Sequence, residues 1–467
     1  MGLVLSILYF VTNYLTPATL FGPLAAIHIE IVLGVLIVFV SLHKLRGSII
    51  LKTPQSLALI GLVVAVFFSV LFWLRWPGRA VQTSLGFLPQ GGIAYFLVVL
   101  HCNSKKKLQI LVLMLLFVCL FVIANGCIAL RGAPNVPSFN TNSHGIGDLP
   151  QEPQEIPYLY PTRNDAGEAF YRIRGLGQIN DPNDLAQLIV SVIPLAFIFW
   201  QPKKVFRNIV LVLLPMCVLL FGAYLTHSRG ALLALVVVAI VAFRQRIGTV
   251  PSLLIATGLF AAAMALHFTG GREISVDSGM SRSDLWAEGM GAFKTHPLFG
   301  VGAGAIGDYT EDGLTAHNSL VVCAAELGFF GLYFWSLFLF STIRDALDVA
   351  SPDKVSEGEP IVHEDGPFPQ AVRRVEALDK EEVNRLARVL ILSLTGFLIT
   401  CWFLSRAFAI TLFILGGMVE VVYEMALQRG MIGPRLRLAR VLPYTGILAI
   451  SLLLAMYILL RTMNLMR

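Results

Sequence analysis

Apolar runs of about 20 residues recur from one end of this chain to the other, and they limit its fold more than any other feature. A helix of that length crosses the hydrocarbon core of a bilayer while satisfying its own backbone hydrogen bonds. Charged residues make up only 14% of the chain, against roughly 25% in soluble domains, and hydrophobic residues make up 56%. The sequence therefore predicts an all-α polytopic membrane protein.

The apolar runs predict about 12 to 13 transmembrane helices. Their expected bounds are 3–22, 27–42, 55–75, 85–100, 108–130, 184–200, 206–226, 229–243, 251–268, 317–343, 387–403, 406–425 and 441–461.

Basic residues between the spans set the expected orientation, because cytoplasmic loops of membrane proteins carry an excess of Lys and Arg. Alternation of the spans places five basic clusters on one side, which are Lys44, Arg46 and Lys52; Lys105, Lys106 and Lys107; Lys203, Lys204 and Arg207; Arg244 and Arg246; and Arg429, Arg435, Arg437 and Arg440. The N-terminus is therefore expected in the cytoplasm, and the segments 131–183 and 269–316 outside. These clusters account for the net charge of +6, which does not indicate a nucleic-acid partner.

On this basis the chain divides into five segments. They are N-terminal transmembrane helices at 1–130, an extracytoplasmic loop at 131–183, a core at 184–343 that contains the outer loop 269–316, a cytoplasmic connector at 344–386, and C-terminal transmembrane helices at 387–467. The first outer loop ends in a helix start, with Asp181 as N-cap and Pro182 as the first helical residue. No segment outside the membrane is large enough for an active site of its own, so any chemistry is expected at the membrane.

The outer loop 269–316 contains a further helix signal. Ser281 and Asp284 match a capping box, and Leu285 and Trp286 fall on one apolar face of the helix that would follow. Such a helix lies in the membrane interface. Arg282 would occupy its first turn, where free backbone N–H groups favour an anion. An arginine that only reaches toward lipid headgroups is the alternative.

Two further arginines lie at the expected outer ends of spans. Arg229 follows Ser228 and precedes Gly230, which permits the close approach of a ligand or a tight turn. Arg406 follows Ser405 at another outer edge. Together with Arg282, these arginines oppose the positive-inside trend and indicate an anionic partner, which is either the phosphate of membrane lipids or a bound lipid diphosphate.

His317 and Asn318 begin a long apolar span. A neutral histidine, whose pKa is ordinarily ~6.5, can accept a proton from a hydroxyl group. A histidine that merely begins the helix is the simpler alternative. Glu326 lies deeper in the same span; a carboxylate there is either a functional residue or a partner for a neighbouring helix.

Other polar residues of the outer loop carry weaker signals. The glycines from Gly300 to Gly307 lack the strand and the lysine of a nucleotide-binding loop, so we expect a flexible or close-packed loop. Asp308, Glu311 and Asp312 offer oxygen ligands for Mg²⁺ or Ca²⁺, but a solvated acidic loop is favoured. No cofactor is expected, and the six scattered cysteines do not have metal-ligand spacing.

In this order the motifs resemble those of the O-antigen ligase and polymerase family. The similar features are the run from Leu225 to Leu232, Arg282 with Trp286 and Phe293, the run from His296 to Gly302, the run from Ala316 to Leu320, the residues Glu326, Leu327 and Gly328, the run from Asn180 to Asp184, and Ser405 with Arg406. The diagnostic region covers residues 205–345.

The resemblance implies a metal-independent membrane glycosyltransferase of the type C class, with 184–343 as its ligase- or polymerase-like core. Such enzymes use glycans on undecaprenyl diphosphate at the periplasmic face of the bacterial inner membrane. By position, Arg229 and Arg282 would hold the donor diphosphate, and His317 would act on the acceptor hydroxyl. The expected substrate-binding residues are Arg406, Ser228, Ser281, Asn318 and Glu326.

Several reactions share this chemistry. A finished glycan can be ligated to lipid A-core, repeat units can be polymerised, or a protein can accept the glycan. The compact loop 269–316 and the short Ser228–Gly230 turn favour ligation. A transporter of lipid-linked sugars or anions would also use outward arginines, but the ionisable residues gather at one face and not through the midplane.

Overall fold

The computed structural model describes residues 1–19, 21, 23–24, 29–45, 52–134, 156–272, 276–311, 313–350, 379–433 and 435–463. The chain packs as two units, each built from segments that are distant in sequence. Unit 1 contains residues 1–10, 30–111 and 275–467, and unit 2 contains residues 11–29 and 112–274. The five segments expected from the sequence follow chain order, and their boundaries stay predictions. Much of the expected outer loop (135–155) and of the connector (351–378) lies outside the described residues.

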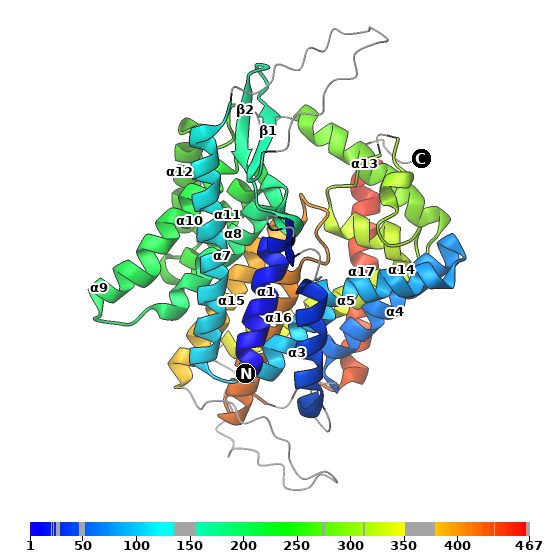
Figure 1. Ribbon diagram of the computed structural model, residues 1–467, viewed down its shortest axis with the longest axis horizontal. Helices are drawn as coiled ribbons and strands as arrows, with labels where there is room; N and C mark the ends of the chain where they lie inside the picture. Colours follow the sequence, from blue (N-terminus) through cyan, green and yellow to red (C-terminus); the bar gives the residue numbers. More distant parts are fainter. Residues whose placement is uncertain are drawn as a thin grey trace. The chain divides into compact units, whose positions relative to one another are not determined.

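Unit 1 is organised around α14 (Ser319–Ala350), which is labelled in Figure 1. Most of the 32 residues of this helix are buried. This helix packs against α4 (Pro54–Leu74), α13 (Val276–Thr295), α15 (Lys380–Cys401), α16 (Ile410–Gln428) and α17 (Leu438–Thr462). The other elements of unit 1 are α3 (Ile29–Leu45), α5 (Pro77–Gln90), α6 (Gly92–His101) and η6 (Ile306–Asp308), while α1 (Gly2–Leu15) and α7 (Lys105–Gly132) each have residues in both units.

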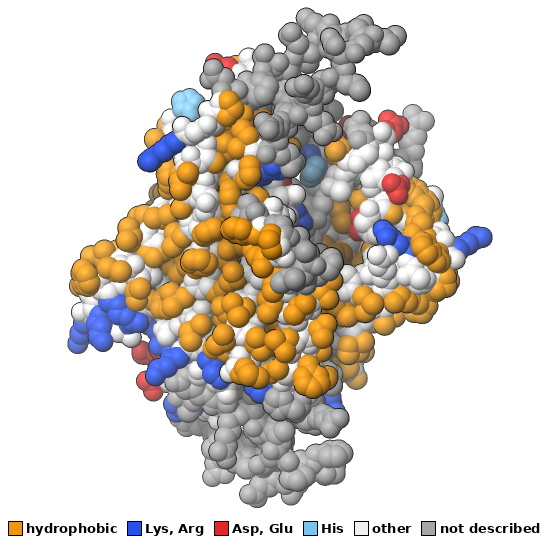
Figure 2. Space-filling view, viewed as in Figure 1, with side chains coloured by type: hydrophobic (Ala, Val, Ile, Leu, Met, Phe, Trp, Pro, Cys, Tyr) orange, Lys and Arg blue, Asp and Glu red, His pale blue; other side chains and the backbone are white. Residues whose placement is uncertain are grey.

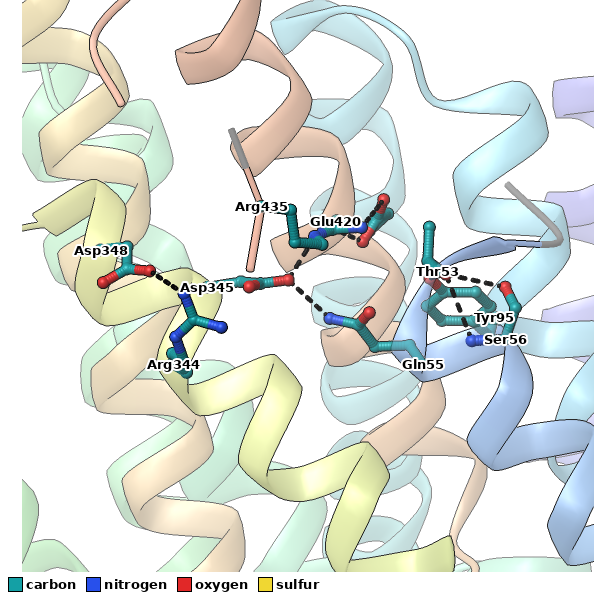
Figure 3. A network of polar contacts seen from close by, with 9 residues as sticks. All are labelled: Thr53, Gln55, Ser56, Tyr95, Arg344, Asp345, Asp348, Glu420 and Arg435. Carbon is teal, nitrogen blue, oxygen red and sulfur yellow. Dashed lines mark hydrogen bonds and ion pairs between the residues drawn. The ribbon is translucent and has the colours of Figure 1, made fainter. Parts of the chain in front are cut away.

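Two buried carboxylates in unit 1 share one guanidinium group (Figure 3). Arg435 Nη2 lies 2.9 Å from Asp345 Oδ2 on α14 and 2.8 Å from Glu420 Oε2 on α16. Gln55 of α4 donates a hydrogen bond of 2.7 Å to the same Asp345 oxygen. Charges buried in this way are costly unless they are paired. The contacts therefore hold the segment before α17 against three helices of the unit.

Unit 2 is organised around α8 (Pro182–Leu195), which packs against α10 (Leu214–Leu225) and α11 (Arg229–Ile247), while α11 also packs against α12 (Thr249–Ala265). The start of α8 confirms the sequence prediction, because Asp181 accepts a hydrogen bond of 2.7 Å from the Asn183 amide and Pro182 is the first helical residue. The short elements of unit 2 are η1 (Pro17–Thr19), η3 (Gly177–Ile179), η4 (Ala196–Phe199), α9 (Val205–Asn208) and the π-helical η5 (Ile209–Leu213).

A β-hairpin in unit 2 was not predicted from the sequence. Strands β1 (Leu159–Arg163) and β2 (Ala169–Ile173) pair antiparallel, with Tyr160 opposite Arg172. Asn164 closes the turn, since its side chain accepts a hydrogen bond from the Glu168 amide, and Gly167 adopts φ = 82°. The signal for a hairpin is present in the sequence as two short strand-like runs separated by Asn, Asp and Gly.

The described helices confirm the prediction of an all-α polytopic membrane protein. Nine of the helices in the described residues are long and apolar enough to cross a membrane, and three shorter apolar helices accompany them. Each of the thirteen expected spans coincides with helical structure, although the first helix ends at Leu15, well before the expected position 22. Figure 2 shows hydrophobic side chains over much of the visible helix surface, with Lys and Arg gathered beside α9.

Candidate active site

The predicted site residues divide between the two units. Ser228 and Arg229 belong to unit 2, and Arg282, His317 and Arg406 belong to unit 1.

In unit 2, a three-residue turn places Arg229 at the start of a helix. The helix α10 ends at Leu225, and α11 begins at Arg229. Ser228 is the buried N-cap of α11, and its hydroxyl accepts a hydrogen bond of 3.4 Å from the Ala231 amide. Arg229 therefore lies in the first turn, where the helix dipole and free N–H groups favour an anion.

Two arginines that the sequence analysis did not single out contact this turn. Arg172 of β2 donates from Nε to the Thr226 carbonyl at 2.6 Å and from Nη2 to Asn183 Oδ1 at 2.9 Å. Arg272, which follows α12, donates from Nη2 to the His227 carbonyl. We name Arg172, Arg229 and Arg272 the arginine cluster.

The electrostatics of the arginine cluster favour a bound anion. Burial, the largest cause, together with the charges of Arg272 and Arg229, lowers the pKa of Arg172 to about 9, although Asp181 and Tyr160 partly offset these effects. Burial also lowers the pKa of the His227 imidazole, with smaller contributions from Arg172 and Arg272. Three guanidinium groups that repel one another are stabilised by an anion that carries more than one negative charge.

In unit 1, hydrogen bonds join the His317 segment to the Arg406 segment. The His317 amide donates to Ser405 Oγ at 2.9 Å, and the Arg406 amide donates to Ser319 Oγ at 3.1 Å. Asn318 begins α14, because its Oδ1 accepts from the amides of Leu320 and Val321, and its Nδ2 donates to the Trp402 carbonyl at 3.2 Å. These hydrogen bonds hold together the two loops that carry the half-buried His317 and Arg406.

The helix that carries Arg282 differs from the prediction. Helix α13 begins at Val276, so Ser281 lies inside the helix and the predicted capping box is wrong. Arg282 is consequently in the second turn and not at the helix N-terminus. The side chain of Ser281 lies outside the described residues. Trp286, one turn after Arg282 on the same face, packs edge-to-face on Trp402 at 5.8 Å between ring centroids.

The glycine-rich segment packs against a break in α14. Gly328 interrupts the helix with φ = 65°, and the backbone from Pro297 to Gly302 pairs with the freed groups. For example, Val301 N donates to Ala325 O at 2.9 Å and Phe329 N donates to Pro297 O at 2.7 Å. A Cβ on Gly300 would lie 2.3 Å from the Glu326 carbonyl carbon, so the segment agrees with the close-packed alternative.

The carboxylates of Glu326 and Glu288 accept hydrogen bonds from backbone amides. The buried Glu326 carboxylate accepts hydrogen bonds from the amides of Gly304 and Ile306. The Glu311 amide donates to Glu288 Oε2 at 3.1 Å, and Asp312 lies outside the described residues. Within the described part of the chain, no group of three or more His, Cys, Asp or Glu side chains is arranged to hold a metal ion.

Comparison with known proteins finds a family match in the central part of the chain. Residues 214–336 match the family model described as O-antigen ligase. Among curated proteins, none matches the chain. The matched region begins at the N-terminus of α10 and ends within α14, so it contains Arg229, Arg282 and His317. The central part of the chain is therefore similar to O-antigen ligases, which supports a membrane glycosyltransferase-like enzyme of the ligase or polymerase type in O-antigen biosynthesis.

Proposed function

We propose that this protein transfers a glycan from an undecaprenyl-diphosphate donor to an acceptor sugar hydroxyl at the periplasmic face of the bacterial inner membrane. The proposed reaction is ligation onto lipid A-core, with inversion at the anomeric carbon. The observation that carries the proposal is the arginine cluster at the N-terminus of α11, inside and beside the region that matches the O-antigen ligase family. A diphosphate is the anionic part of such a donor.

Arg229 and Arg282 are assigned to the donor diphosphate, with Arg406 in support. Guanidinium groups bind phosphate oxygens through paired, charge-assisted hydrogen bonds. A diphosphate leaves the anomeric carbon with its negative charge, so stabilisation of that charge is the main requirement of the reaction. Arg229 and Arg282 belong to different units, and both are assigned to the diphosphate because their guanidinium groups can bind phosphate oxygens.

His317 is assigned as the base that accepts the proton of the acceptor hydroxyl. A sugar hydroxyl is a weak nucleophile, and a positioned base contributes roughly 10²- to 10⁴-fold to the rate. The hydroxyl oxygen attacks the anomeric carbon, the bond to the diphosphate breaks, and the proton passes to the imidazole. Ser228, Asn318 and Glu326 bind backbone groups, so we propose that they shape the site around these residues.

The first experiment uses purified protein, an undecaprenyl-diphosphate oligosaccharide and lipid A-core. A glycan-capped lipid A-core on a gel supports ligation, whereas a ladder that stays on the polyprenyl carrier indicates a polymerase. Translocation of the donor without any product would point to a transporter and contradict the proposal. Loss of activity with a chelator would show that the reaction needs a metal.

A matched pair of variants tests the base. His317 and His267 both have positive φ angles, of 47° and 53°, which asparagine tolerates well. His317→Asn is expected to lower kcat by about 10²- to 10⁴-fold and to keep the affinity for the donor, because only the base is lost. His267→Asn, at an exposed histidine, is expected to keep full activity. Near-normal turnover by His317→Asn removes His317 from this role.

A further inference from the structure

The turn that presents Arg229 is held by side chains from two other segments of unit 2. Arg172 of β2 binds the Thr226 carbonyl, and Arg272 after α12 binds the next carbonyl, that of His227. These carbonyls directly precede the N-cap Ser228 and so determine the direction in which α11 starts.

The turn needs this support because its backbone is strained. His227 has φ = 48°, a left-handed conformation that residues other than glycine adopt at a cost. Its ring lies between Phe170 and Tyr224, with centroid distances of 5.2 and 5.3 Å, and its Nδ1 lies 3.0 Å from the Phe268 carbonyl. Groups from the hairpin, α10 and the end of α12 therefore converge on this one residue.

The guanidinium of Arg172 is directed at the protein. The residue is only 4% exposed, and two of its nitrogens donate to Thr226 O and Asn183 Oδ1. Asn183 belongs to the first turn of α8, which packs against both α10 and α11. Arg172 thus links the hairpin, the start of α8 and the turn before Arg229.

We propose that Arg172 and Arg272 are positioning residues, which fix the turn at 226–228 and thereby aim Arg229 at its anion. That the anion is the donor diphosphate rests on the proposed function; the positioning of the turn does not. The two arginines act through the backbone carbonyls that they bind.

Binding of undecaprenyl diphosphate to the full-length protein tests the consequence for the site. Arg172→Ala and Arg272→Ala are each expected to raise the Kd by about 10- to 100-fold, the effect of losing a hydrogen bond that involves a charged group. Arg163→Ala, at an exposed arginine of the same hairpin, is the control and is expected to leave the Kd unchanged. A Kd unchanged by both substitutions overturns the proposal.

Two further variants separate positioning from simple charge. Arg172→Lys keeps the charge but loses the planar fork that reaches two acceptors. It is expected to bind as weakly as Arg172→Ala, and full recovery of binding would assign Arg172 an electrostatic role only.

The double variant Arg172→Ala/Arg229→Ala is expected to bind no more weakly than Arg229→Ala, because Arg172 acts through Arg229. Additive losses contradict the proposal.

Hydrogen exchange gives a readout that does not depend on the donor. The amides of Ala231 and Leu232 donate to the side chain and carbonyl of Ser228, so they report on the start of α11. They are expected to exchange faster in the Arg172 and Arg272 variants, and unchanged exchange overturns the positioning role. If Arg172→Ala does not fold, the same exchange is measured in Arg172→Lys, whose side chain fills nearly the same space, and the same two outcomes decide the test. Faster exchange in a protein that never binds undecaprenyl diphosphate would reject the proposed function and retain the positioning.

Discussion

Among the described residues, three histidines have left-handed backbone torsions: His227, His267 and His317, with φ angles of 48°, 53° and 47°. This conformation costs roughly 1–2 kcal/mol for a residue with a Cβ, so surrounding contacts must hold it. Two of these residues, His227 and His317, lie two positions before the first residues of helices α11 and α14. Strain of this kind is often found at functional sites, and here it lies next to the residues assigned to the donor and the acceptor.

At His227 the structure predicts a pH effect on stability. Burial lowers the pKa of this histidine in the folded protein, whereas in the unfolded chain it titrates near ~6.5. The unfolded chain therefore binds the proton more readily, and stability is expected to fall as the pH decreases from 7 to 5. Arg172 and Arg272 act in the same direction as burial. His227→Asn is expected to reduce the slope of thermal unfolding temperature against pH, and an unchanged slope would contradict this.

The geometry of helix α14 departs from that of a regular helix at Gly328. Its break at Gly328 frees backbone groups that would be unsatisfied in an apolar span, and the segment from Pro297 to Gly302 binds them. The N-terminal half of α14 is capped by Asn318 and joined to the 402–406 loop. The break therefore lets one element connect the His317 loop to the glycine-rich segment.

The break makes Gly328 sensitive to substitution. A Cβ at this position would lie 2.4 Å from the Leu298 carbonyl carbon, and φ is 65°. Gly328→Ala is expected to destabilise the protein by about 1–3 kcal/mol or more, seen as a lower thermal unfolding temperature. Gly291→Ala is the control, since a Cβ there meets nothing within 4 Å and alanine favours the helix α13. Equal unfolding temperatures for the two variants would show that the break is not required.

For the whole molecule, the buried contacts of Arg435 tie distant parts of unit 1 together. This arginine precedes α17, and its partners come from α14 and α16, with Gln55 of α4 bound to the same carboxylate (Figure 3). Its guanidinium also lies 4.3 Å from the centre of the Tyr423 ring. Burial lowers the pKa of Arg435, but the charges of Glu420 and Asp345 outweigh burial and raise the pKa well above its ordinary value, so the residue stays charged.

Removal of this arginine would leave two buried carboxylates without their partner. Arg435→Met is expected to destabilise the protein by about 3–5 kcal/mol, measured by unfolding of the purified protein in detergent. Arg429→Met, at an exposed arginine a few residues earlier, is expected to have little effect. Adding Asp345→Asn and Glu420→Gln to Arg435→Met is expected to restore part of the lost stability, because the unpaired charges are then removed. A harmless Arg435→Met would show that the ion pairs do not stabilise unit 1.

Sequence alone determined the membrane class, the positions of the spans and the start of α8, because each depends on local hydrophobicity or on capping residues. It also marked Arg229, Arg282, His317 and Arg406 through short motifs. The sequence also contains a signal for the hairpin, in two short strand-like runs joined by turn residues. The predicted start of α13 is five residues too late, because a capping pattern can also occur inside a helix.

Only the tertiary structure decided which residues act together. Arg172, Arg229 and Arg272 are separated by dozens of residues, and their approach depends on how β2, α11 and the end of α12 pack in unit 2. The break in α14 is likewise stable only because a distant segment supplies its hydrogen bonds. Local sequence fixes what each segment can form, whereas contacts between distant segments fix where charges meet and which backbone groups are satisfied.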